Sequence, residues 1–171
     1  MPFVRRIMWA LHPYSTLTPD VVVEAVEALG HRCDGRVLAL NSYENRVYQV
    51  GREDDVPVVV KFYRPGRWST AAILEEHAFA LELTRAEVPV VAPDVVDGRS
   101  LFELGGFRYA VYRRQGGRWP ELGTKEERQW MGRFLARIHA IGRTRQFHHR
   151  PRLDWRVLGG ETMGYLLEEG W

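Results

Sequence analysis

The segment from Asn41 to Arg64 constrains the fold of this chain more than any other. It holds two β-like runs around a polar connection, and the second run, VPVVVKFYR, carries one lysine, Lys61, among apolar residues. Burying a lysine among valines is costly unless an acceptor lies close by. A helical pattern with two adjacent acids, Glu75 and Glu76, follows. The sequence therefore predicts a hairpin and a helix whose carboxylate can face a strand ammonium group.

Two interpretations of Lys61 follow from this arrangement. A lysine on an edge strand discourages aggregation, and the strand by itself favours that interpretation. Alternatively, Lys61 donates to the α- and β-phosphate oxygens of ATP while a helix carboxylate pairs with it, as in the amino-terminal lobe of kinases. The turn before the strand and the acid-bearing helix after it favour the second interpretation.

Helical periodicity distinguishes the two acids. Glu76 lies on an apolar stripe that is expected to face the sheet, whereas Glu75 lies about 100° further round the helix. The stripe consists of Ile73, Ala80 and Leu83. We therefore predict that Glu76 pairs with the strand lysine and that Glu75 is a solvated helix acid.

The turn Asn41–Asn45 occupies the position of a phosphate-covering loop, although it contains no glycine. Its backbone amides and the Ser42 hydroxyl can still donate hydrogen bonds to phosphate oxygens. Asn and Ser are also common turn formers, so without its context the motif predicts a plain hairpin turn, and by itself it is a weak phosphate motif.

Capping and hairpin signals define the remaining elements. Thr18, Ser69 or Thr70, and Thr124 precede helical patterns, and Gly105-Gly106 joins two strand-like runs. The expected helices are 18–29, 69–86, 124–142 and a short piece near 161–169, and the expected strands are 36–40, 46–50, 56–63, 100–104 and 107–112.

This order of elements predicts the α+β class: a protein-kinase-like amino-terminal lobe with about five antiparallel strands, followed by the beginning of a helical carboxy-terminal lobe. The expected divisions are a loose amino-terminal extension over 1–17, the lobe over 18–112, a hinge over 113–123 and an incomplete helical part over 124–171.

Composition narrows the function classes. The net charge of +2 is too small to argue for nucleic-acid binding, and the basic stretch from Arg113 to Arg156 is of a kind common on solvated helix faces. No segment approaches the ~20 apolar residues of a membrane span. The single cysteine, Cys33, precludes an internal disulfide and fits a reducing cytoplasm. We expect a cytoplasmic protein that binds neither nucleic acid nor membrane.

Five segments closely resemble the bacterial stress response kinase A family: LNSYENRVYQ, VVKFYRPGRW, ILEEHAFAL, VPVVAP and GRFLARIH. The resemblance extends from about Leu17 to Arg152, and NSYENRVY is not shared by aminoglycoside or choline kinases generally. It implies a serine/threonine protein kinase with an aminoglycoside-phosphotransferase-like fold. It also implies ATP and Mg²⁺ as cofactors and a protein hydroxyl as the phosphate acceptor.

The resemblance also implies roles by position. Ser42 would contact ATP, Lys61 would bind phosphates with Glu76 as its partner, and the segment from 112 to 117 would be the interlobe hinge whose backbone meets the adenine edge. The candidate cofactor-binding residues are Ser42, Lys61, Glu76, Tyr112, Arg113 and Gln115.

The chain departs from the family in its second half. Family members carry a His-Gly-Asp-x-x-x-x-Asn loop and a later metal-binding Asp, whereas the only asparagines here are Asn41 and Asn45. Loss of a general base alone typically costs about 10²–10⁴ in rate. We therefore predict no catalytic residue and no metal ligand in this chain, almost no kinase activity by itself, and the ATP-binding amino-terminal part of a truncated kinase.

Two other functions remain open. The chain could be a non-catalytic module that binds nucleotide or a partner, or part of a phosphotransferase for a small alcohol of the homoserine or aminoglycoside type. A self-sufficient module predicts a stable monomer, whereas a fragment would expose its interlobe surface and self-associate.

Overall fold

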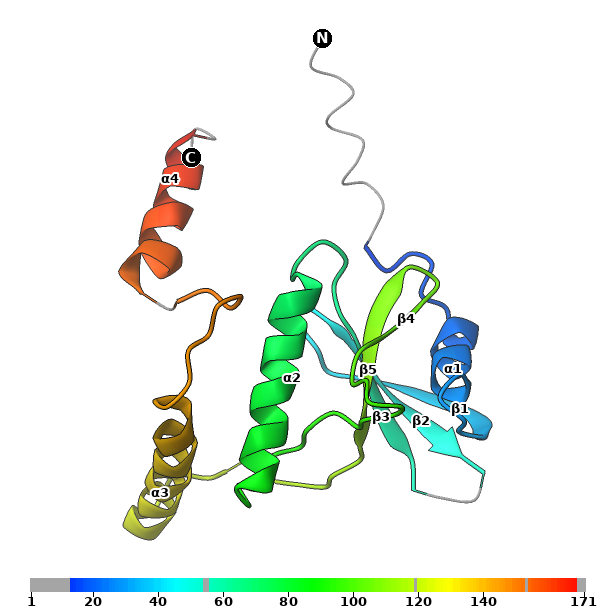
Figure 1. Cartoon of the computed structure of the whole chain (residues 1–171), viewed down its shortest axis with the longest axis horizontal. Coiled ribbons are helices and arrows are strands. Elements are labelled where there is room, and N and C mark those ends of the chain that lie inside the picture. Colours follow the sequence, from blue (N-terminus) through cyan, green and yellow to red (C-terminus); the bar gives the residue numbers. More distant parts are fainter. Residues whose placement is uncertain (1–12, 54–55, 119, 153, 169–171) are drawn as a thin grey trace.

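A five-stranded antiparallel sheet with the strand order β1-β2-β3-β5-β4 forms the centre of the computed structural model. The structure describes residues 13–53, 56–118, 120–152 and 154–168. Helix α1 covers one face of the sheet and α2 the other, while α3 lies beyond α2 and α4 stands away from the sheet (Figure 1). The elements are α1 Pro19–Glu27, β1 Cys33–Leu40, β2 Arg46–Arg52, β3 Val58–Phe62, α2 Thr70–Arg85, β4 Phe102–Leu104, β5 Phe107–Arg113, α3 Lys125–Gly142, the π-helical turn Arg156–Gly160 and α4 Glu161–Glu168.

The predicted fold class and helix starts are confirmed. The side chain of Thr18 accepts a hydrogen bond from the amide of Val21, and Ser69 caps α2 in the same way. Thr124 and Glu127 form the expected reciprocal capping box at the start of α3. These caps satisfy amide groups that the first turn of a helix leaves without partners.

Three strand starts differ from the prediction. Strand β3 begins at Val58 rather than Val56, because Pro57 has no N–H group to donate to the sheet. Strand β1 begins at Cys33 rather than Arg36, because Cys33 pairs with Arg52 across a register shift that precedes Val37. Strand β4 begins at Phe102 rather than Ser100, whose hydroxyl instead meets the ring of His77. The differences in β1 and β4 arise from partners that are distant in sequence.

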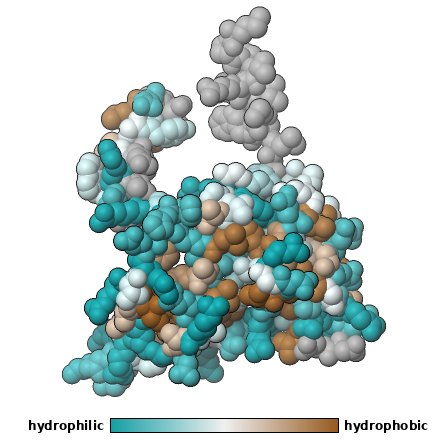
Figure 2. Space-filling view, viewed as in Figure 1, coloured by the Kyte–Doolittle hydropathy of each residue, from teal (hydrophilic) through white to brown (hydrophobic). Residues whose placement is uncertain are grey.

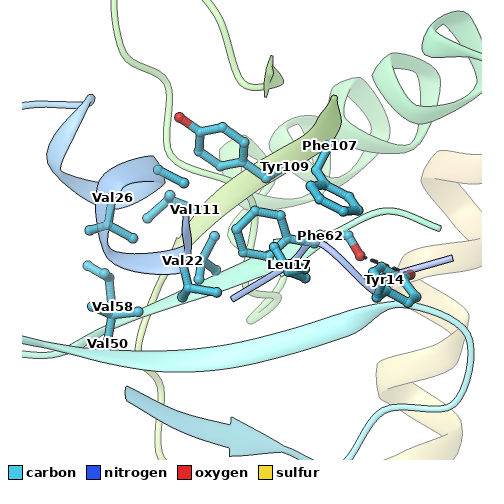
Figure 3. Packing of buried hydrophobic residues seen from close by; sticks show 12 residues of the cluster. Tyr14, Leu17, Val22, Val26, Val50, Val58, Phe62, Phe107, Tyr109 and Val111 are labelled. Carbon is cyan, nitrogen blue, oxygen red and sulfur yellow. Dashed lines mark hydrogen bonds between the residues drawn. The ribbon is translucent and has the colours of Figure 1, made fainter. Parts of the chain in front are cut away.

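The larger core lies between the sheet and α1. Strand alternation turns Val58, Val60 and Phe62 toward α1, where all three are buried. Figure 3 shows how the aromatic and valine side chains of this cluster meet. Its remaining members are Tyr14, Leu17, Val22, Ala25, Val26, Val50, Phe107, Tyr109 and Val111.

Tyr14 and Leu17 place part of the expected loose extension inside this core. Both side chains are buried, and Tyr14 stacks on Phe107 with ring centroids 6.1 Å apart. The packed lobe therefore begins before Thr18. The rest of the predicted extension, residues 1–12, lies outside the described part of the chain.

The second sheet face packs against α2 through a smaller cluster. Tyr63, Ile73 and Ala110 are buried there, with Trp68, Leu101 and Tyr112 beside them. Alternation brings Val59 and Lys61 to this face together with Tyr63. The strand lysine and the helix acids therefore share one layer of the molecule.

Helix α3 contacts α2 without burying any of its own residues. The Arg137 guanidinium donates to the carbonyl of Glu87 at 2.7 Å, just beyond the end of α2. The rings of Trp130 and Phe134 stack on each other with centroids 5.9 Å apart, and Trp130 stays exposed. Polar contacts at the end of α2 thus hold this helix, more than core packing does.

Candidate nucleotide-binding site

Lys61 on β3 pairs with Glu76 on α2. The ammonium nitrogen lies 3.0 Å from Oε1 of Glu76, and the two side chains keep 22% and 31% of their surface exposed. Lys61 also lies over the ring of Tyr63, 4.6 Å from its centroid. The predicted choice of Glu76 over Glu75 is confirmed. The pair is shielded enough to be ordered and open enough for a ligand to reach.

Glu76 has a second cationic partner that sequence reasoning missed. Its Oε2 binds the guanidinium of Arg150, which follows α3 in the chain. The same guanidinium lies over the Trp68 ring, 4.4 Å from the centroid. No local pattern could have pointed to Arg150, because it lies 74 residues after Glu76.

The prediction that Glu75 is a solvated acid is wrong. Its carboxylate accepts three backbone N–H groups, from His148 at 2.6 Å, Arg150 at 2.9 Å and His149 at 3.0 Å. These hydrogen bonds, led by the one from His148, hold the pKa of Glu75 below its usual range. The two adjacent acids on α2 therefore have different partners: Glu75 accepts hydrogen bonds from backbone amides, and Glu76 forms ion pairs with two cationic side chains.

A buried polar chain lies behind the Lys61–Glu76 pair. His77 meets the hydroxyl of Tyr63 at 2.6 Å and that of Ser100 at 2.9 Å, and Tyr63 meets the hydroxyl of Tyr112 at 3.2 Å. Burial lowers the pKa of His77 to about 4 and raises the pKa of Tyr112 to about 12. At neutral pH this network of hydrogen-bonded side chains is uncharged, and it links α2 to Tyr112 at the end of β5.

The loop between β1 and β2 is held in place although it lacks glycine. Glu44 accepts hydrogen bonds from Trp68 at 2.8 Å and Arg67 at 2.9 Å, and Asn45 accepts from the backbone of Arg64. Burial alone would raise the pKa of Glu44, but these two side-chain donors outweigh it and lower that pKa. Anchored at this end, the loop can present Ser42 and its amides in one arrangement.

Replacing Glu44 with glutamine should loosen this loop. We expect faster hydrogen exchange over residues 41–45 and a free energy of unfolding lower by about 1 kcal/mol, because a charge-assisted hydrogen bond to Arg67 is weakened. Exchange mass spectrometry and urea unfolding measure the two effects. Glu53→Gln is the control, since Glu53 is exposed and pairs with Arg32 outside the loop. Equal exchange in both variants would argue against anchoring by Glu44.

Strand register supplies an apolar surface next to Lys61. Directly paired residues of antiparallel strands project to the same face. Val47 is paired with Lys61, Gln49 with Val59, and Leu38 with Gln49, so these side chains share the face with the lysine. Leu38 is exposed and Val47 half-buried. An apolar strip beside a cation suits a planar base that carries phosphates.

The predicted hinge residues divide between two surroundings. Tyr112 lies on the Lys61 face through its contact with Tyr63, whereas Arg113 and Gln115 line a cavity of about 780 Å³ on which Trp130 and Phe134 also border. Neither Lys61 nor Glu76 lines that cavity. Hydrophobic residues gather around α2 in this part of the molecule, between α3 and the sheet (Figure 2). The nucleotide roles of Ser42, Tyr112, Arg113 and Gln115 stay predictions.

Within the described ranges, no three His, Cys, Asp or Glu side chains cluster closely enough to hold a metal ion. None of the described helices has the length and apolar character that crossing a membrane requires.

The fold and the site together define the class. An antiparallel sheet whose strand lysine pairs with a carboxylate of the next helix, followed by a connection and a further helix, is the arrangement of a kinase-type amino-terminal lobe. Comparison with known proteins agrees, since the sequence pattern of the phosphotransferase enzyme family matches residues 36–169. The chain belongs to that family.

Curated relatives support the predicted resemblance. The chain is 46% identical over 140 residues to "Stress response kinase A" of Escherichia coli O157:H7, which covers 82% of this chain and 43% of the relative. It is 46% identical over 138 residues to "Serine/threonine protein kinase RdoA" of Salmonella typhimurium, covering 81% and 42%. The chain thus spans less than half the length of these relatives.

Solved structures share the fold. The amicoumacin kinase hAmiN, determined with AMP-PNP, Ca²⁺ and Ami, aligns with a TM-score of 0.64 at 22% identity over 80% of this chain and 44% of its own. A microcompartment-associated aminopropanol kinase aligns with a TM-score of 0.60 at 24% identity over 84% and 48%.

Proposed function

We propose that this chain is the ATP-binding lobe of a serine/threonine protein kinase of the stress response type. The observation that carries the proposal is the Lys61–Glu76 pair, 3.0 Å apart, beside the apolar strip of β1, β2 and β3. A lysine presented by a helix glutamate binds α- and β-phosphate oxygens in kinases, and an apolar strip accommodates the adenine ring.

The donors of Lys61 fit this task. An ammonium group has three N–H donors, and the hydrogen bond to Glu76 uses one of them. Partial exposure of the lysine leaves its other donors within reach of a phosphate. Ser42 and the amides of the anchored loop would add donors to the same phosphates.

Transfer of the phosphate needs further groups. Mg²⁺, when bound, neutralises charge on the phosphates, and an aspartate orients the acceptor hydroxyl. The described residues present no cluster fit to hold Mg²⁺, and the sequence has no His-Gly-Asp motif. We therefore assign nucleotide binding to the chain and expect very slow phosphoryl transfer by the chain alone.

A protein hydroxyl is the acceptor we propose. Relatives at 46% identity carry the names stress response kinase and serine/threonine protein kinase, whereas the small-molecule kinases, at 22% and 24%, support the fold alone. We also propose a cytoplasmic location, because Cys33 is a free thiol and a reducing compartment keeps it so.

An amine-reactive acyl phosphate of ATP tests the nucleotide proposal. The sequence has two lysines, Lys61 and Lys125, so peptide mass spectrometry can assign the labelled side chain without ambiguity. We expect Lys61 to be acylated and excess ATP to suppress this labelling. Exposed Lys125 should react weakly, to the same extent with and without ATP. Labelling of both lysines that ATP does not reduce would overturn the proposal.

A further inference from the structure

Glu76 forms ion pairs with two cations, and the second cation changes the net charge beside Lys61. Oε1 of Glu76 accepts from Lys61, and Oε2 binds Arg150. One carboxylate between two cations leaves a net charge of +1 on the cluster, whereas a lone Lys–Glu pair would be neutral. A neutral pair attracts a triphosphate weakly, and a cluster with one surplus positive charge attracts it strongly.

Contacts between residues 145–150 and α2 hold Arg150 in position. The three backbone amides of residues 148–150 donate to the carboxylate of Glu75, the residue directly before Glu76. Phe147 packs edge-on against Phe79 at 5.3 Å between centroids, and Arg145 forms an ion pair with Glu82. Residues 145–150 therefore run along α2 and deliver one guanidinium to Glu76.

Trp68 connects this cluster to the loop between β1 and β2. Its ring lies under the Arg150 guanidinium, and its indole N–H donates to Glu44 at 2.8 Å. A planar guanidinium stacked on an aromatic ring is held in orientation as well as in position. Glu76 is bound at both oxygens, and these two contacts restrain its carboxylate from rotating away from Lys61.

We propose that Arg150 is a positioning residue for phosphate binding: it fixes Glu76, which orients Lys61, and it supplies the surplus positive charge. This inference rests on the proposed nucleotide site. It predicts that removal of Arg150 weakens the binding of phosphate-bearing ligands and leaves the binding of the base unchanged.

The test compares the affinities of the full chain for a fluorescent ATP analogue and for the matching adenosine analogue. We expect Arg150→Gln to weaken the ATP analogue by roughly tenfold, the effect of one charge at short range, with less than about a twofold change for adenosine. Arg150→Lys should lose less, because it keeps the charge but not the stacked plane. The control is Arg32→Gln, which removes an exposed Arg–Glu pair with Glu53 and touches neither Glu76 nor the segment 145–150.

A double variant separates positioning from a general loss of structure. In a Glu76→Gln background, Arg150→Gln should cost the ATP analogue less affinity than in the wild type, because the positioning effect acts through the missing carboxylate and only the effect of the charge remains. Equal losses for the ATP and adenosine analogues would overturn the inference, as would an effect of Arg150→Gln that persists in full without Glu76. If Arg150→Gln does not fold, Arg150→Lys decides by the same ATP-to-adenosine comparison.

Two variants distinguish an error in the role of Arg150 from an error in the proposed nucleotide site. If Lys61→Ala loses ATP binding while Arg150→Gln binds like the wild type, the site stands and the role of Arg150 is refuted. If the wild-type chain binds no ATP analogue, both proposals fall together.

Discussion

Replacing Lys61 with alanine should remove the measurable affinity of the chain for an ATP analogue while its far-ultraviolet circular dichroism stays unchanged. Hydrogen bonds to charged groups contribute about 1.5–3 kcal/mol each, so the loss of two phosphate contacts corresponds to roughly a hundredfold or more in affinity. The fold should tolerate the change, because Lys61 lies on the half-exposed face of β3 while the core residues of that strand face α1. Fluorescence titration measures the affinity.

The other lysine provides the control for this experiment. Lys125 is exposed in the first turn of α3, and Lys125→Ala removes the same charge and the same side chain there. We expect unchanged ATP affinity in that variant. If Lys61→Ala binds as tightly as Lys125→Ala, then Lys61 does not contact the nucleotide and the nucleotide site must lie elsewhere. The edge-strand interpretation of Lys61 does not apply, because β3 is the central strand of the sheet.

Acidification should destabilise the chain through His77. Burial lowers the folded-state pKa of this side chain from 6.5 to about 4, so in that interval the unfolded chain binds a proton that the folded chain does not. The free energy of unfolding therefore falls as the pH falls through this window, by about 2–3 kcal/mol from this residue between pH 7.5 and pH 4.5. Nearby charges modulate the shift: Glu76 raises the pKa, whereas Lys61 and Arg150 lower it.

Urea unfolding at the two pH values measures the effect, and two variants isolate it. His77→Gln removes the titration, so its loss of stability on acidification should be smaller than that of the wild type by about 2–3 kcal/mol. His139→Gln, on the exposed face of α3, should behave like the wild type. Protonation of carboxylates with a lowered pKa, such as Glu44 and Glu75, also lowers the free energy of unfolding, and it does so equally in the wild type and both variants. An unchanged acid response in His77→Gln would contradict the assignment.

Local periodicity explains why much of the site was predictable. Strand alternation put Lys61 on the face opposite the valine core, and the helical period placed Glu76 rather than Glu75 toward it. Capping residues marked where α1, α2 and α3 begin, since their side chains bond amides only a few residues away. Each of these inferences depends on neighbours within about one or two turns.

Contacts between distant segments were not predictable in this way. The position of Arg150 on Glu76, the three amides held by Glu75 and the burial of Tyr14 join residues between which the sequence shows no repeating relation. Likewise, the sequence pattern shows His77 only as one residue of an amphipathic helix. Its contacts with the hydroxyls of Tyr63 and Ser100 are evident only in the structure.

The sequence by itself determined most of the elements and the faces of β3 and α2, because short-range sterics and the two periods of strand and helix depend on consecutive residues. It indicated the family through the resemblance of five segments. Only the tertiary structure decided which charges share Glu76 and which backbone Glu75 holds. The reason is physical: a carboxylate binds whatever donors the packing of the whole chain brings within about 3 Å, and that depends on loop paths that local sequence does not specify.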